Sequence, residues 1–217
     1  MKKNSYPGKF IAFEGLDGSG QSTQVERLAK HLRRIYKDLP NKPSVYATKE
    51  PSTGVFGGFI REGLRERWRY GQIHGPLMMQ ALFVADRAHH LENEIIPNLI
   101  KGNTVITDRY AFSTIAYGAA EDRELWDCLI AMNKTFLEPD ITVFLKARPE
   151  SSMNRMKKSR EHLELYEKEA MLKRVFSNYV KLSQIYKSFR TVNGECSISE
   201  VSREIRAVIE KEFDLKQ

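Results

Sequence analysis

The sequence of 217 residues predicts an α/β fold in which helices cover both faces of a parallel sheet. Short apolar runs alternate along the chain with longer segments of helical periodicity, as they do in proteins with parallel sheets. The first run, residues 10–13, leads through a glycine-rich turn directly into a helical pattern. No repeat, low-complexity segment or linker interrupts this alternation. We therefore expect residues 1–217 to form a single doubly wound domain.

The glycine-rich turn has the spacing of a phosphate-binding P-loop. Four residues separate Gly15 from Gly20, and one more separates Gly20 from Ser22. Glycines let backbone N–H groups approach an anion, and the start of the following helix adds a partial positive charge. In this motif the hydroxyl at the position of Ser22 binds Mg²⁺. The alternative is an ordinary turn, but the strand before it, the helix after it and the spacing favour a P-loop.

One position departs from the motif. The lysine that usually reaches the β- and γ-phosphates is replaced by Gln21. A glutamine amide donates hydrogen bonds but carries no charge. We therefore expect the loop to bind phosphate without its usual cationic clamp.

Composition narrows the class of protein. Hydrophobic residues make up 41% and charged residues 29% of the sequence, as in globular proteins. No apolar run approaches the ~20 residues of a membrane span, and the N-terminus lacks the apolar centre of a signal peptide. Cys128 and Cys196 lie far apart, which implies neither a disulfide framework nor a zinc site. The net charge of +7 suits a polyanionic partner, but no nucleic-acid motif appears. We expect a cytoplasmic enzyme that binds neither nucleic acid nor membranes.

The second strand is expected at residues 44–48, and Lys49 follows at its C-terminal end. Ligands of open parallel sheets bind at this edge, so Lys49 faces either a phosphate or, as an ordinary surface residue, solvent. Amphipathic helices are expected at 57–70 and at 75–100.

Phe83 and Arg87 lie four residues apart on one face of the helix expected at 75–100. An aromatic ring and a guanidinium on one face suit a planar base. The ring would stack on the base, and the guanidinium would hydrogen-bond to it. In isolation, however, such an aromatic residue usually belongs to the core and such an arginine to the surface.

The third strand, residues 104–108, ends at Asp108, and Arg109 follows. An acidic residue after an apolar strand is where P-loop enzymes hold Mg²⁺. Arg109 beside it would clamp the transferring phosphoryl group; the alternative is a purely structural ion pair. On the short helix that follows, Ser113 and Tyr117 lie four residues apart, and we expect both to face the pocket.

The remaining chain continues the same alternation. We expect a helix at 125–137, a strand at 139–145, a helix from Pro149, a long helix at 164–189, a strand at 189–192 and a helix at 198–213. The densest basic run extends from Arg155 to Arg160. It suits either a lid that closes over phosphates or a solvated basic turn.

Together these features resemble the thymidylate kinases, P-loop enzymes that pass a phosphoryl group from ATP to dTMP. The resemblance extends from Phe10 to about Ile209. Its motifs are Phe-Glu-Gly-Leu-Asp-Gly-Ser-Gly at 13–20, Thr-Lys-Glu-Pro at 48–51, Phe-Val-Ala-Asp-Arg at 83–87, Asp-Arg-Tyr-Ala-Phe-Ser at 108–113 with Ala-Tyr at 116–117, and the stretch 139–155. The resemblance implies a P-loop NTPase fold, a three-layer sandwich whose five-stranded parallel sheet is wrapped by helices, with a short lid at about 155–165. It also implies a homodimer that uses ATP and Mg²⁺.

The resemblance further implies an acceptor site for dTMP. Phe83 would stack on thymine and Arg87 would bond its O4 atom. Tyr117 would sit under the deoxyribose, where a 2′-OH would clash, and Asp17 would bond the 3′-OH. The implied acceptor site also includes Lys49, Arg109 and Ser113.

For ATP, the resemblance implies that the phosphates are surrounded by Gly15, Asp17, Gly18, Ser19, Gly20, Gln21, Ser22 and Thr23. Ser22 and Asp108 would organise Mg²⁺. Arg109 would act in catalysis with Asp108 and with a lid arginine. Residues 17–19 of the glycine-rich loop contain no arginine, so the lid would supply it. Arg155 and Arg160 are the candidates.

Three positions depart from the family pattern: Gln21, Leu165, where the family often has an arginine, and Gly118, which replaces a larger residue and is expected to loosen the base pocket. The leading hypothesis is an active kinase that converts dTMP to dTDP for dTTP synthesis. One alternative is a kinase for another nucleotide. The other is a nucleotide-binding protein with weak or no kinase activity, because Gln21 carries no charge.

Overall fold

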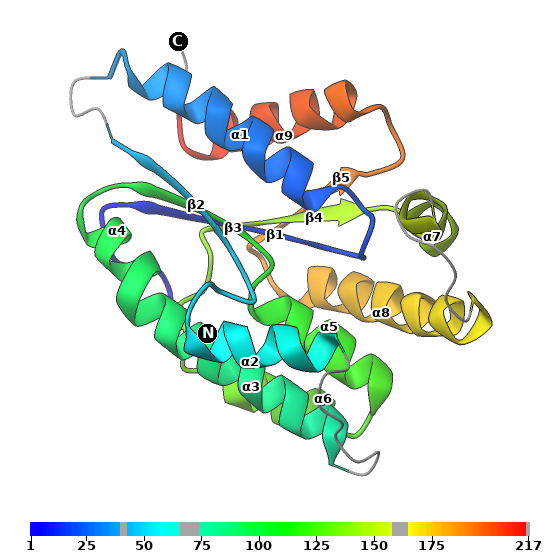
Figure 1. Ribbon diagram of the computed structural model, residues 1–217. Helices are drawn as coiled ribbons and strands as arrows, with labels where there is room; N and C mark the ends of the chain where they lie inside the picture. The colour runs from blue at the N-terminus through cyan, green and yellow to red at the C-terminus, as the bar shows by residue number, and fades with distance from the viewer. Residues whose placement is uncertain (40–42, 66–73, 158–164, 216–217) are drawn as a thin grey trace.

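The computed structural model describes residues 1–39, 43–65, 74–157 and 165–215. Within these ranges, five strands form one parallel sheet in the order β2-β3-β1-β4-β5 (Figure 1). The strands are β1 (Lys9–Gly15), β2 (Val45–Lys49), β3 (Thr104–Asp108), β4 (Ile141–Lys146) and β5 (Phe189–Asn193). The sheet confirms the predicted fold class, and each strand lies close to its predicted position.

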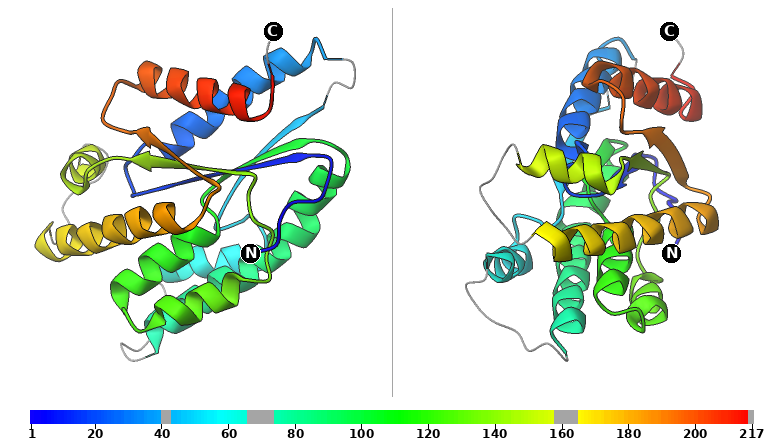
Figure 2. Two further views of the ribbon diagram at one scale, coloured as in Figure 1. Left: turned by 180° about the vertical axis from the view of Figure 1, so that it is seen from behind. Right: turned by 90° about the vertical axis from the view of Figure 1, so that its right-hand side faces the viewer.

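Helices cover both faces of the sheet and produce three layers (Figures 1 and 2). On one face lie α1 (Gln21–Tyr36) and α9 (Ile198–Glu212). On the other lie α3 (Gly75–His90), a π-helical segment (Leu91–Ile95), α4 (Ile96–Ile100), α5 (Ala111–Glu121) and α8 (Leu165–Ile185). Further helices are α2 (Val55–Leu64), which packs on α3, α6 (Leu125–Asn133), which packs on α5, and α7 (Pro149–Lys157), which follows β4.

β1 is the central strand, and side chains on both of its faces are buried. Ile11 and Phe13 belong to the core beneath α1 and α9, while Phe10 and Ala12 belong to the core on the opposite face. Successive side chains of a strand point to opposite faces, so a strand covered on both faces reads as a continuous apolar run. The next residue in this strand, Glu14, is equally buried.

Several helices end at other residues than the sequence predicts. The helix expected at 57–70 occupies Val55–Leu64, and residues 66–73 lie outside the described ranges. The helix expected at 125–137 ends at Asn133, because the chain around Leu137 forms a bridge with Lys2. Backbone hydrogen bonds of 2.8 and 2.7 Å join Lys2 to the residues on either side of Leu137. In the described ranges, no helix combines the length and apolar character needed to cross a membrane.

Candidate active site

The P-loop connects β1 to α1 and requires glycine at two positions for different reasons. Gly20, the residue before α1, has a left-handed backbone with φ 97°, which residues with a Cβ atom rarely adopt. Gly18 has φ 78°, and a Cβ atom there would lie 2.5 Å from the carbonyl oxygen of Ser152 on α7. The loop therefore holds its shape only with glycine at both positions.

A cavity of about 260 Å³ lies against this loop. It is lined by Leu16, Asp17, Gly18, Gly20, Gln21, Ser22, Thr23, Asp108 and Arg109. Most of these residues were predicted to surround ATP or Mg²⁺. The phosphate half of the predicted site is thus assembled around one cavity.

Gln21 points back into the loop. Its side-chain nitrogen Nε2 donates to the Leu16 carbonyl at 3.3 Å and to Ser19 Oγ at 3.2 Å. Its oxygen Oε1 is buried and has no hydrogen-bond partner among the described residues. The amide therefore braces the loop from within and brings no charge to the cavity.

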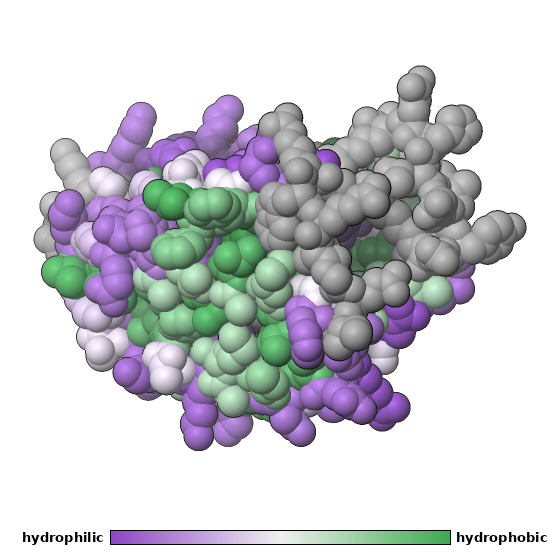
Figure 3. All heavy atoms as spheres, turned by 60° about the horizontal axis from the view of Figure 1, so that its bottom comes forward, coloured by the Kyte–Doolittle hydropathy of each residue, from purple (hydrophilic) through white to green (hydrophobic). Residues whose placement is uncertain are grey.

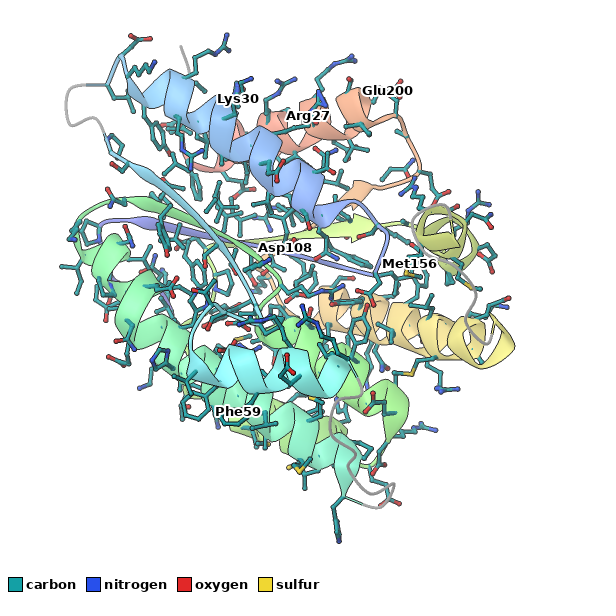
Figure 4. All side chains as sticks on the ribbon, in the orientation of Figure 1. Arg27, Lys30, Phe59, Asp108, Met156 and Glu200 are labelled. Atoms are coloured by element: carbon teal, nitrogen blue, oxygen red, sulfur yellow. The ribbon has the colours of Figure 1, made fainter. Side chains whose placement is uncertain are left out.

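Ser22 and Asp108 meet at the cavity from opposite sides. Asp108 lies at the end of β3 (Figure 4). Its Oδ2 accepts a hydrogen bond of 2.5 Å from Ser22 Oγ, in the first turn of α1. One hydroxyl and one carboxylate suit Mg²⁺, which takes its other ligands from phosphate oxygens and water. Lys49 is exposed and lies directly beside Asp108 in the register of β2 and β3.

Arg109 has an unusual backbone conformation for a residue with a large side chain. Its φ is 71°, in the left-handed region, which costs free energy and persists only where neighbouring groups enforce it. Here the Arg109 N–H donates to the Phe13 carbonyl at 2.9 Å, and Thr107 Oγ1 donates to the Arg109 carbonyl at 2.8 Å. Both bonds fix the point at which the chain leaves β3.

The Arg109 guanidinium connects the P-loop with α5. One nitrogen donates to Asp17 Oδ1 at 2.7 Å, and the other donates to Ser113 Oγ at 2.9 Å. The Tyr117 ring lies beneath the guanidinium, and Arg109 Cζ is 5.0 Å from the centre of that ring. Burial alone would lower the pKa of Arg109, but interactions with Tyr117 and Asp17 raise it well above its ordinary value. The guanidinium is therefore charged at every physiological pH.

Glu14, which was not predicted to belong to the site, lies behind Ser113. Its carboxylate accepts hydrogen bonds from Ser113 Oγ at 2.6 Å and from the Tyr179 hydroxyl at 2.9 Å. Burial raises the pKa of Glu14 to about 7, although the bond from Ser113 and the charge of Arg109 partly offset this effect. The available signal was an acidic residue inside an apolar strand, which costs free energy unless it has partners.

The predicted base-binding pair lies on α3, apart from the cavity. Phe83 is partly buried and precedes Arg87 by one turn. Arg87 is buried and donates to Glu50 at 2.6 Å, Asn133 at 2.6 Å and Thr114 at 3.0 Å. Its Nε has no partner in the part of the chain that the structure describes. The partners Glu50, Thr114 and Asn133 were not predicted from the sequence to contact Arg87.

Tyr117 and Gly118 lie on α5, between the two halves of the site. The Tyr117 hydroxyl accepts a hydrogen bond from the backbone N–H of Asp17 at 3.0 Å. A Cβ atom on Gly118 would lie 2.5 Å from Leu129 Cδ1 and 2.7 Å from Gln80 Cγ. The expectation that Gly118 loosens the pocket is therefore wrong, because Leu129 and Gln80 fill that space.

Of the two predicted lid arginines, the structure describes only Arg155. Arg155 lies on α7, where it donates to the Gly194 carbonyl at 2.9 Å and to the Ser19 carbonyl at 3.4 Å. It is thus placed beside the P-loop, as is Met156 on the same helix (Figure 4). Arg160 and residues 158–164, most of the predicted lid, lie outside the described residues.

The pKa of Glu14 leads to a prediction about stability. The pKa of Glu14 is about 7 in the folded state, above the unfolded value of 4.5. The contribution of this carboxyl to the free energy of unfolding is therefore present at low pH and is lost as the pH rises through about 7. Arg109, Arg87 and Tyr179 act on this carboxyl from neighbouring elements. Between pH 5 and 8, the unfolding free energy of the parent should fall by about 2–3 kcal/mol more than that of Glu14→Gln, which cannot ionise. Urea denaturation across this range measures the difference, and parallel pH curves would contradict the prediction.

Comparison with known proteins places these features in a family. The family model described as thymidylate kinase matches residues 13–205. The probable thymidylate kinase of Thermococcus gammatolerans is 36% identical over 211 residues, which cover 95% of this chain and 98% of that protein. The thymidylate kinase of Carboxydothermus hydrogenoformans is 36% identical, with 94% and 97% covered, and that of Synechococcus sp. is 33% identical, with 90% and 94% covered. The chain belongs to the thymidylate kinase family.

Proposed function

We propose that this protein transfers the γ-phosphoryl group of ATP to dTMP, forming ADP and dTDP. The observation that carries the proposal is the Arg109 guanidinium, which lies at the phosphate cavity and is bonded both to the P-loop and to α5. Phosphoryl transfer requires positioning and positive charge where negative charge spreads in the transition state. Arg109 supplies such a charge between the predicted donor and acceptor sites. The names of the relatives point to the same reaction.

Ser22 and Asp108 would hold Mg²⁺, which, when bound with ATP, neutralises charge on the phosphates. The residues of the chain then have separate tasks. Asp17, which pairs with Arg109, would turn to the 3′-OH of the acceptor sugar. That exchange leaves one side of the guanidinium free for phosphate oxygens. The acceptor phosphate is already ionised, so no general base is needed.

The acceptor base would lie between Phe83 and Arg87. Glu50 and Asn133 hold the Arg87 guanidinium from two sides, which leaves its Nε hydrogen available for thymine O4. A pre-positioned donor of this kind favours a base with a carbonyl oxygen over one with an amino group. Lys49, Ser113 and Tyr117 complete the proposed acceptor site.

Gln21 supports a second candidate, a protein that binds nucleotides without turning them over. Its amide is uncharged and engaged within the loop, so the cradle lacks one cation. A lost transition-state charge contact costs several kcal/mol in typical enzymes, on the order of 3 kcal/mol. The retained array of Ser22, Asp108 and Arg109 nevertheless favours an active kinase.

The direct test is release of ADP from ATP and Mg²⁺ with a panel of monophosphates as acceptors. We expect turnover with dTMP and much less with its ribose counterpart, because the Tyr117 ring would clash with a 2′-OH. In Tyr117→Ala this preference should relax. A folded sample that binds ATP and dTMP but releases no ADP would show that the second candidate is correct.

The Phe83 ring should contribute to dTMP binding. We expect Phe83→Ala to weaken dTMP binding by roughly 1–3 kcal/mol, the range for stacking of a base on an aromatic ring. The affinity for ATP should change much less. Titration calorimetry measures both affinities. Phe213→Ala, which removes a partly buried ring at the end of α9, is the matched control. Unchanged dTMP affinity in Phe83→Ala would assign this ring to the core.

We also propose that the protein is a cytoplasmic homodimer joined through α2 and α3. Large exposed hydrophobic side chains gather on these helices, among them Val55, Phe59 and Leu64 of α2 and Met78 of α3. Figure 3 shows a broad hydrophobic area on the face to which they belong. Exposed apolar patches of this kind usually mark protein interfaces. A second copy of the chain is the partner that the family resemblance implies.

Sedimentation velocity tests this assembly. The parent should sediment as a dimer, and Phe59→Asp should sediment as a monomer, because a charge would be buried at the interface. Ile185→Asp, at another exposed hydrophobic residue on α8, should remain dimeric. A monomeric parent, or a dimer that Phe59→Asp leaves intact, would contradict the proposal.

A further inference from the structure

We propose that Glu14 is a positioning residue that holds the Arg109 guanidinium in place for phosphoryl transfer, acting through Ser113 and Tyr179. The inference rests on the proposed function, because it assigns Arg109 to the transferring phosphoryl group. It adds a residue that contacts neither nucleotide. The geometry that supports it is a hydrogen-bonded group on the side of Arg109 away from Asp17.

The first part of this group lies between Glu14 and Arg109. Ser113 Oγ donates to one oxygen of the Glu14 carboxylate, Oε2, at 2.6 Å, and the Tyr179 hydroxyl donates to the same oxygen at 2.9 Å. A hydroxyl has one hydrogen. With that hydrogen directed at Glu14, the lone pairs of Ser113 and Tyr179 are available to Arg109. The guanidinium donates to them at 2.9 and 3.5 Å.

The other oxygen of the carboxylate fixes the helix that carries Ser113. Glu14 Oε1 accepts hydrogen bonds from the backbone N–H groups of Tyr110 at 3.1 Å and Ser113 at 3.2 Å. These groups lie at the start of α5, which has no capping side chain of its own. A carboxylate at a helix N-terminus satisfies free N–H groups and interacts favourably with the helix dipole. Glu14 thus fixes both the Ser113 backbone and its hydroxyl.

The elements that converge on Glu14 are those that the reaction must bring together. Glu14 is in β1, one residue before the P-loop begins at Gly15, and Arg109 follows β3. Ser113 is in α5 and Tyr179 is in α8, the first helix after the predicted lid. Glu14 is completely buried, and no solvent is needed to complete its bonds. A fixed carboxylate behind the guanidinium limits the motion of the guanidinium and leaves its charge directed at the cavity.

The rival explanation is that Glu14 only stabilises the fold. The two explanations differ in what happens when Arg109 is removed. A residue that acts through Arg109 has no further effect on the rate once Arg109 is gone. A residue that stabilises the fold alone has the same effect whether or not Arg109 is present.

The experiment measures single-turnover phosphoryl transfer from ATP to dTMP, with enzyme in excess, in a double-mutant cycle. Glu14→Gln should lower the rate of transfer about tenfold or more, while the KM values for ATP and dTMP in steady-state assays change less than about threefold. In an Arg109→Ala background, Glu14→Gln should lower the rate no further. An equal loss in both backgrounds, or a loss confined to KM, would overturn the inference.

A second variant keeps the test decisive if Glu14→Gln does not fold. Tyr179→Phe removes one of the two hydroxyls between Glu14 and Arg109 and should lower the rate only when Arg109 is present. The control is Tyr36→Phe, which removes a buried hydroxyl bonded to Thr104 at 2.9 Å on the opposite face of the sheet and should leave the rate unchanged. A Tyr179→Phe rate equal to that of the parent would overturn the inference. A parent that makes no dTDP would instead refute the proposed function.

Discussion

The parallel pairing of β1 with β3 is the constraint on which the site depends. Its register places Phe13 beside Asp108, so the P-loop and the Asp108–Arg109 pair leave the sheet at the same edge. The bond from the Arg109 N–H to the Phe13 carbonyl extends this pairing by one residue and holds Arg109 in a left-handed conformation. The side chain consequently points along the P-loop. Backbone geometry thereby fixes the charge that we propose for catalysis.

Hydrogen bonds between buried polar groups hold the other side chains of the site in place. Glu50 holds Arg87 of α3, and Glu14 holds Arg109 at the cavity through Ser113. Isolated buried charges are strongly destabilising, so such groups persist where they are paired and hydrogen-bonded. Gln21 Oε1 and Arg87 Nε are among the buried side-chain atoms that have no hydrogen-bond partner within the described ranges. The first belongs to the residue that replaces the usual P-loop lysine, and the second belongs to the arginine proposed to bind the base.

Local sequence patterns were sufficient to predict the strands and the P-loop, because an apolar run, glycine spacing and a helix start are all local signals. They also placed Asp108 and Arg109 at the correct edge of the sheet. The partners of Glu14 could not be predicted, since Ser113 and Tyr179 are 99 and 165 residues away in sequence. The same holds for Arg87 and Asn133, which are 46 residues apart. The expected effect of Gly118 was wrong because it depends on Gln80 and Leu129, which come from two other helices.

The central claim is that Arg109 stays bonded to Ser113 while it exchanges Asp17 for phosphate. A crystal structure with dTMP and a non-hydrolysable ATP analogue tests this claim most directly. The bond between Arg109 and Asp17, now 2.7 Å, should be broken, with phosphate oxygens in its place. The bond between Arg109 and Ser113, now 2.9 Å, should be unchanged. A guanidinium that leaves Ser113, or that keeps Asp17 while both nucleotides are bound, would contradict the account.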